Sequence, residues 1–278
     1  MTSFFAMRTL LFAAECLGGS LLLLGGAAIA ARFARSAALR HFVWLTAFGA
    51  MLMLPVAAVV VPPQIVMHRA ADVTTTRVAV AAIGTTSAPL ATEPFVRVAA
   101  KRTRNITTRD AALALFALWA IGFLWAAMRL FFGAIGVNAL HMSSSRIASD
   151  DIDPDCAGCE LRLASENSGP MTWGFVRPVI LLPAEAVHWS SERRRAVLLH
   201  ELAHVRRRDS LAQILSLMAC ALYWPNPLAW IGARAMRRDA EIAADDRVID
   251  AGVKPSAYAR ELLQLAEEYR GLRRAAVA

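Results

Sequence analysis

Three long apolar runs dominate the pattern of hydrophobic and polar positions in this 278-residue chain. They cover about residues 10–31, 42–61 and 111–132, and each approaches the roughly 20 residues that a helix needs to cross a bilayer core. The sequence therefore predicts a mainly α membrane protein whose residues 1–136 form an N-terminal bundle of transmembrane helices. Residues 62–110 are rich in Thr, Ala, Pro and Val without a sustained helical period, which predicts a loosely ordered external loop.

Composition supports this class, because 57% of the residues are hydrophobic, whereas soluble domains are nearer half. The net charge of +8 is spread over membrane flanks and helix ends rather than gathered with interleaved aromatic residues. We therefore expect contact with membrane lipid and no direct binding of nucleic acid.

Three arginines after the first run, Arg32, Arg35 and Arg40, predict the orientation in the membrane. By the positive-inside rule their short loop is cytoplasmic, the N-terminus and residues 62–110 are external, and the chain after residue 132 is cytoplasmic. Seven Lys and Arg residues in the external loop weaken this assignment. The first run could also be a cleaved signal peptide, but the positive cluster that follows it favours a retained anchor.

Residues 137–278 are predicted to form a small α+β domain. A polar stretch at 144–170 includes the alternating segment 160–164, which is typical of a strand. Residues 179–182 are aliphatic and lie between two prolines, which predicts a compact strand at the edge of a sheet.

Helices are predicted for the rest of the domain. One begins near Ser190, a good N-cap, and reaches about Arg207. The apolar run 210–224 is short for a complete span, so we interpret it as a core helix or a membrane-embedded half helix. Asn226 and Pro227 are typical of the start of a further helix, and a last amphipathic helix follows at about 256–270.

The segment HELAH places His200 and His204 four residues apart, on one face of a helix. Two imidazoles at this spacing can ligate one metal ion, and Glu201 between them can act as general base on a water at that ion. A catalytic zinc uses three protein ligands and one open position, where the pKa of water falls to about 7. A third ligand is therefore required.

Glu241 and Asp245 are the candidates for completing the site, because they lie one helical turn apart and can face the same partner. Glu241 would ligate the metal, and Asp245 would orient a histidine. Taken alone, these acids would be a solvated helix face paired with Arg237 and Arg238, but the upstream HExxH favours the metal site. Asp239 points away from the pair at about 100 degrees per residue and is left out.

Two further features have no assigned role. Glu15 lies inside the first apolar run, where a carboxylate is costly, and both a function and a place near the interface stay open. Cys156 and Cys159 form a lone CxxC, which without a second pair supports neither a zinc ribbon nor a redox centre.

Four segments resemble the BlaR/MecR family, membrane zinc metallopeptidases of the gluzincin type: GPMTWGFVRPVILLP at 169–183, HELAHVRRRD at 200–209, YWPNPLAWIGAR at 223–234 and EIAAD at 241–245. The resemblance implies that Zn²⁺ is bound, that Glu201 is the catalytic glutamate and that Asp245 is the helper residue. The zinc ligands it implies are His200, His204 and Glu241.

The resemblance also implies regulatory proteolysis of a cytoplasmic protein, in the best-known members a transcriptional repressor, with self-cleavage as an activation step. It implies a multi-pass protein of the bacterial inner membrane with a cytoplasmic protease domain, in which strand 179–182 could take up substrate as an added strand. The best-known members also carry an external penicillin-binding sensor. No Ser-x-x-Lys motif occurs in these residues, which argues against β-lactam sensing by them; whether a sensor domain follows in a longer chain or another signal acts stays open.

Two rival functions stay open. A quality-control protease similar to the HtpX group would share the HExxH and ExxxD elements but cleave many proteins. A non-catalytic transducer with a structural zinc would keep signalling without Glu201. The oligomeric state, including a homodimer, is also open, and so is the oxyanion stabiliser, for which Tyr223, Arg234 and Arg237 are candidates.

Overall fold

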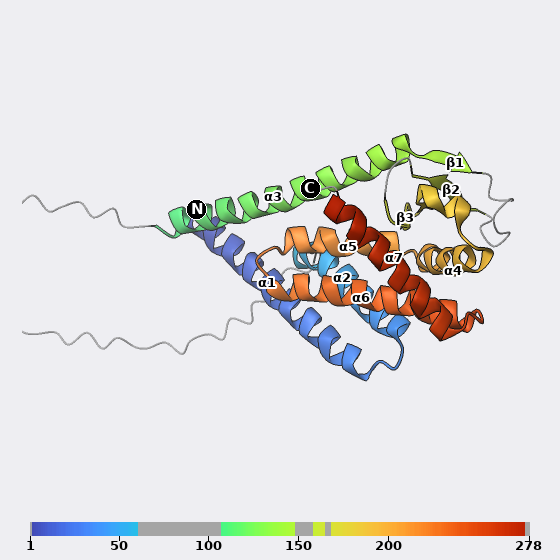
Figure 1. Cartoon of the computed structure of the whole chain (residues 1–278). Helices are drawn as coiled ribbons and strands as arrows, with labels where there is room; N and C mark the ends of the chain where they lie inside the picture. Colours follow the sequence, from blue (N-terminus) through green and yellow to red (C-terminus); the bar gives the residue numbers. More distant parts are fainter. Residues whose placement is uncertain (1, 61–106, 148–157, 165–167, 276–278) are drawn as a thin grey trace, which may run out of the picture.

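The computed structural model describes residues 2–60, 107–147, 158–164 and 168–275, which form a mainly helical molecule with one small sheet (Figure 1). Three of the described helices are long and apolar enough to cross a membrane, which confirms the predicted class. The helices are α1 (Thr2–Phe33), α2 (Ala37–Val60) and α3 (Thr108–Ser143). Most of the predicted external loop and Cys156 lie outside the described residues.

Helix α3 is longer than the run that predicted it. It begins at a capping box formed by Thr107 and Asp110 and ends before Ser144. Its 36 residues extend about 54 Å, whereas a bilayer core is about 30 Å thick. The second region was expected to begin after position 136, but the helix continues through this position. No proline interrupts the chain there. Its far end leads directly into the sheet (Figure 1).

The sheet has four strands in the order β1, β2, β4, β3. They are β1 (Ser145–Ile147), β2 (Glu160–Leu163), β3 (Met171–Trp173) and β4 (Val179–Leu182). Strand β4 pairs in parallel with β2 and antiparallel with β3, so the prediction that it is an edge strand is wrong. Pro178 and Pro183 lie just outside the paired residues, where they remove no ladder donor, and all four residues of β4 are buried.

Four more helices follow the 3-10 helix η3 (Ala184–His188), and they confirm the predicted order. They are α4 (Ser191–Arg207), α5 (Asp209–Leu222), α6 (Pro227–Asp250) and α7 (Pro255–Ala275). The predicted caps form: the Ser190 side chain accepts from the amide of Arg193, and that of Asn226 accepts from the amide of Leu228. Only Arg208, with a left-handed φ of 56°, separates α4 from α5.

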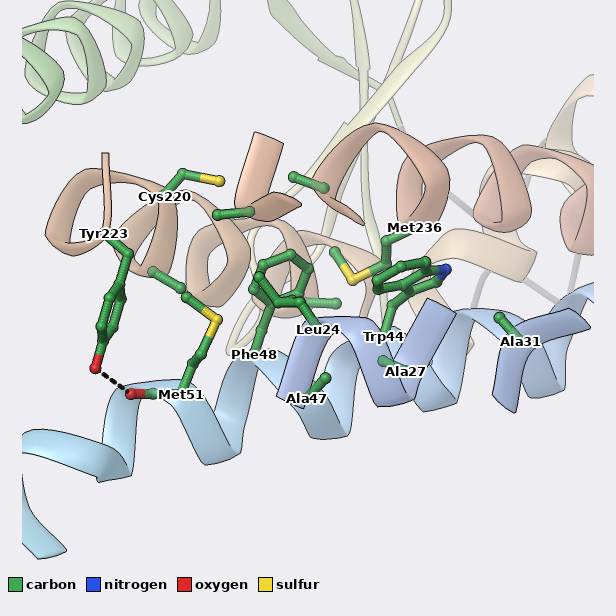
Figure 2. Packing of buried hydrophobic residues seen from close by; sticks show 14 of the residues in the cluster. Leu24, Ala27, Ala31, Trp44, Ala47, Phe48, Met51, Cys220, Tyr223 and Met236 are labelled. Carbon is green, nitrogen blue, oxygen red and sulfur yellow. Dashed lines mark hydrogen bonds between the residues drawn. The ribbon is translucent and has the colours of Figure 1, made fainter. Parts of the chain in front are cut away.

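Two large buried clusters hold most of these elements together, and a smaller third cluster joins α4, α6 and α7. In the first, side chains of α1 and α2 pack against α5 and α6, including Leu24, Phe48, Cys220 and Met236 (Figure 2). In the second, the sheet packs on the apolar face of α4. Helices of the second half of the chain are therefore buried against the candidate membrane spans.

Candidate metal centre

Helix α4 presents its histidines to α6 because its other face is buried. Val197, Leu198 and Leu202 pack on the sheet, while Leu199 packs toward α6 and α7. Residues three and four apart share a helix face, so the apolar positions fix the direction of the two imidazoles. His200 and His204 are left partly exposed, at 17% and 14% of their side chains.

The described residues contain a three-ligand cluster of His200, His204 and Glu241. The Nε2 atoms of the two histidines are 3.1 Å apart. Oε2 of Glu241 lies 3.4 Å from Nε2 of His200 and 3.9 Å from Nε2 of His204. Nitrogen and oxygen ligands at about 2.0–2.1 Å from a tetrahedral zinc are about 3.3 Å from one another, so the three atoms fit around one ion.

Glu201 is buried, with only 6% of the residue exposed. The hydroxyl of Thr172 on β3 donates to its Oε2 at 2.6 Å. Burial raises the pKa of Glu201, and the hydrogen bond from Thr172 and the two neighbouring histidines oppose this rise. An elevated pKa suits a group that must both take and return a proton near neutral pH.

His200 is supported from outside the cluster by two side chains. Its Nδ1 lies 3.1 Å from Oδ1 of Asp245 and 3.0 Å from the hydroxyl of Tyr258, which also donates to Asp245 at 2.7 Å. Burial lowers the pKa of His200, but the hydrogen bonds with Asp245 and Glu241 outweigh it and raise the pKa to about 9. The same contact with His200 lowers the pKa of Glu241, which stays ionised as a ligand should.

His204 has its own carboxylate partner, Asp209, which the sequence analysis did not assign. Oδ2 of Asp209 lies 2.6 Å from Nδ1 of His204, and Arg207 donates to both oxygens of Asp209. Nε2 of His41, at the start of α2, lies 3.6 Å from Oδ1 of Asp209. Asp209 and Tyr258 were missed because single residues of these types carry no spacing signal, although Asp209 stands at the end of the HELAHVRRRD segment.

Of the three candidate oxyanion stabilisers, one lies far from the metal cluster and two lie one and two helical turns from Glu241. Tyr223 is buried at the far end of α5, about 21 Å along the helix from Asp209, and its hydroxyl donates to the carbonyl of Met51 (Figure 2). Arg237 and Arg234 are exposed on α6, one and two turns before Glu241. The structure thus gives none of these three candidates a hydrogen bond to the cluster; the arginine that reaches it is Arg207, whose Nη2 lies 3.4 Å from Nδ1 of His204.

Three other residues singled out in the sequence have separate places. Asp239 is 1% exposed and pairs with Arg40 of α2 at 2.8 Å, consistent with its exclusion from the metal site. Glu15 is exposed on α1, and Cys159 is a half-buried free cysteine in the turn before β2.

The fold and the cluster together define a class, membrane proteins with a metallopeptidase-type centre. A family model described as BlaR1 peptidase M56 matches residues 28–278, and the chain belongs to this family. It is similar to the regulatory protein BlaR1 of Bacillus licheniformis, with 36% identity over 80 residues, or 29% of this chain and 13% of that protein. The methicillin resistance mecR1 protein of Staphylococcus aureus strain Mu50 is 30% identical over 87 residues, or 31% of this chain and 15% of that protein.

The matched segments are therefore a small part of both relatives. The family and the apolar helices make this chain a bacterial membrane protein of a peptidase family, with a candidate metal cluster.

Proposed function

We propose that this chain is a zinc-dependent endopeptidase of the bacterial inner membrane that cleaves a cytoplasmic regulatory protein. The observation that supports it best is the convergence of His200, His204 and Glu241 beside the buried carboxylate of Glu201. Two imidazoles and one carboxylate are a donor set of catalytic zinc, which leaves one position open.

The chemistry divides between the ion and Glu201. Bound by the three ligands, zinc would polarise a water molecule and the scissile carbonyl. Glu201 takes the proton of the attacking water and returns it to the leaving amine. Thr172 holds one carboxylate oxygen of Glu201 and leaves the other free for this transfer.

Strand β3 is the substrate-binding edge in this proposal. The earlier expectation for residues 179–182 does not hold, because both sides of β4 are paired. Strand β3 stands at the end of the sheet, and its Thr172 contacts Glu201 directly. An extended peptide added to the free side of β3 would therefore pass beside the general base.

The position of the cluster supports a cytoplasmic orientation of the metal centre. Arg40 and His41 at the start of α2 are in contact with Asp239 and Asp209, so the cluster lies at the end of α2 that the positive-inside rule places in the cytoplasm. The protein therefore crosses the membrane several times with its metal centre inside the cell. The name of one relative, a regulatory protein, supports a regulatory role. The resemblance to the BlaR/MecR family implies a transcriptional repressor as the substrate, with self-cleavage as an activating step.

The test compares the wild type with Glu201→Gln, expressed at equal levels in the membrane of one host. We expect both proteins to retain one zinc per chain after detergent purification, and only the wild type to generate new N-termini on cytoplasmic proteins or on itself. A few cleaved proteins would support a regulatory protease, and a broad set would favour the HtpX-like alternative. Identical N-termini with both proteins would refute the endopeptidase and favour the transducer with a structural zinc.

A further inference from the structure

Helices α5 and α6 form a hairpin with an unusual composition for the cytoplasmic part of a membrane enzyme. The 24 consecutive residues 210–233 contain no Asp, Glu, Lys, Arg or His, and Asp209 and Arg234 flank them. Helix α5 has 14 residues, or about 21 Å, which is more than half but less than all of a bilayer core of about 30 Å. The hairpin is therefore too short to cross a membrane and apolar enough to enter one.

The turn of the hairpin lies beside the middle of the spans in α1 and α2 and beside the first half of α3. The hydroxyl of Tyr223 donates to the carbonyl of Met51, near the centre of α2. The side-chain amide of Asn226 donates to the hydroxyl of Ser20, near the centre of the span in α1. The indole of Trp119, in the span of α3, donates to the carbonyl of Leu222. If these helices cross the membrane, the midpoints of α1 and α2 place the turn deep in its interior.

Protein groups are the hydrogen-bond partners of several polar groups in the turn. Besides the carbonyl of Leu222, that of Trp224 accepts from the indole of Trp230, and the amide of Leu228 is capped by Asn226. The indole of Trp224 in turn donates to the carbonyl of Trp119. Irregular backbone is tolerated at membrane depth where it is buried in protein or lines a water-filled cavity, and these contacts fit the first case. Gly122 of α3 leaves the space that the Trp224 ring occupies.

The outward face of the hairpin is apolar and uncovered. Ile214 and Met218 of α5 and Ile231 of α6 are 43%, 50% and 55% exposed. Apolar residues of the spans, such as Leu22 of α1, are also exposed. In water such a combined surface would be a strong aggregation site, whereas hydrocarbon covers it without cost.

We propose that residues 209–234 are a re-entrant hairpin that enters the bilayer from the side of the metal centre, turns near its middle and returns, with lipid acyl chains covering its outward face. The hairpin would hold the junction of α4 and α5, and with it the contact of Asp209 with His204, at the membrane surface. Cleavage would then be confined to substrates that approach that surface.

Nitroxide labels test this proposal in the full chain. Met218→Cys and Ile231→Cys are introduced separately after replacement of Cys16, Cys156, Cys159 and Cys220 by Ala, and the proteins are placed in phosphatidylcholine vesicles. Leu22→Cys in the span of α1 is the matched lipid-exposed control, and Glu192→Cys, exposed at the start of α4, is the matched aqueous control.

We expect both hairpin labels to collide with oxygen more than with a water-soluble nickel chelate, as at position 22. Collision with the nickel chelate as at position 192 would overturn the proposal, since the hairpin would then be in water. Low access to both reagents would also overturn it, because a second copy of the protein would cover the face.

A second measurement uses the unmodified protein. A lipid with a photoreactive group on its acyl chain is expected to label residues 209–234 as well as the three spans. Labelling of the spans alone would contradict a lipid-covered hairpin.

Discussion

The contact between Asp209 and His204 makes a quantitative prediction about metal affinity. The carboxylate lies 2.6 Å from Nδ1 of His204 and is 11% exposed, so water screens the interaction little. It holds the ring with Nε2 toward the cluster and makes that nitrogen a better ligand. Asp209→Asn keeps the shape of the side chain but removes its charge. Loss of such a support weakens metal binding about 10–100-fold, or by about 1.4–2.7 kcal/mol.

The assay is competition for zinc between the detergent-purified protein and a chelator of known affinity. Asp246→Asn is the matched control, because Asp246 is exposed on α6. We expect Asp209→Asn to lose zinc at a chelator concentration 10–100-fold lower than the wild type does, as is typical when such a support is removed. The control should behave as the wild type. Equal affinities of Asp209→Asn and the wild type would refute the role of Asp209, and equal losses in both variants would indicate a general effect of charge.

Three further predictions concern the surroundings of the cluster. Tyr258→Phe removes one contact to Nδ1 of His200. Because one hydrogen bond contributes about 1 kcal/mol, zinc binding should weaken about fivefold. A loss of affinity larger than that of Asp209→Asn would contradict this prediction. His200 has a pKa of about 9 without metal and must be neutral to ligate, so zinc affinity should rise about tenfold per pH unit up to about pH 9 and then level off; affinity that is constant across this range would be inconsistent with the pKa. Asp239→Ala leaves Arg40 without its buried partner and should lower stability by up to about 3 kcal/mol, seen as a lower midpoint of thermal unfolding, whereas Arg238→Ala on the exposed face should not.

Much of this molecule could be predicted from local patterns in the chain. The apolar runs predicted the three candidate spans, and Ser190 and Asn226 predicted helix starts because a cap acts on amides two or three residues away. The HExxH spacing predicted that the two imidazoles share a face, since the geometry of one helix determines it. The one-turn spacing of Glu241 and Asp245 predicted that Asp245 supports a histidine, and the structure shows that this histidine is His200.

Other features depended on which elements pack side by side. The prolines around β4 suggested an edge, but the pairing of β2 and β3 on its two sides made it central. Tyr223 was a candidate oxyanion stabiliser from its place in the sequence. In the structure α5 packs along α2, and the hydroxyl of Tyr223 donates to the carbonyl of Met51.

By itself, the sequence determined the class of the protein, the positions of its helices and the two histidines of the cluster, because these depend on hydrophobicity and on contacts within one or two turns. Only the tertiary structure decided which strand is free, where Asp209 and Tyr258 act, and how deeply the α5–α6 turn lies among the spans. Those features join residues distant in the chain, and the packing of whole helix faces against one another selects their partners.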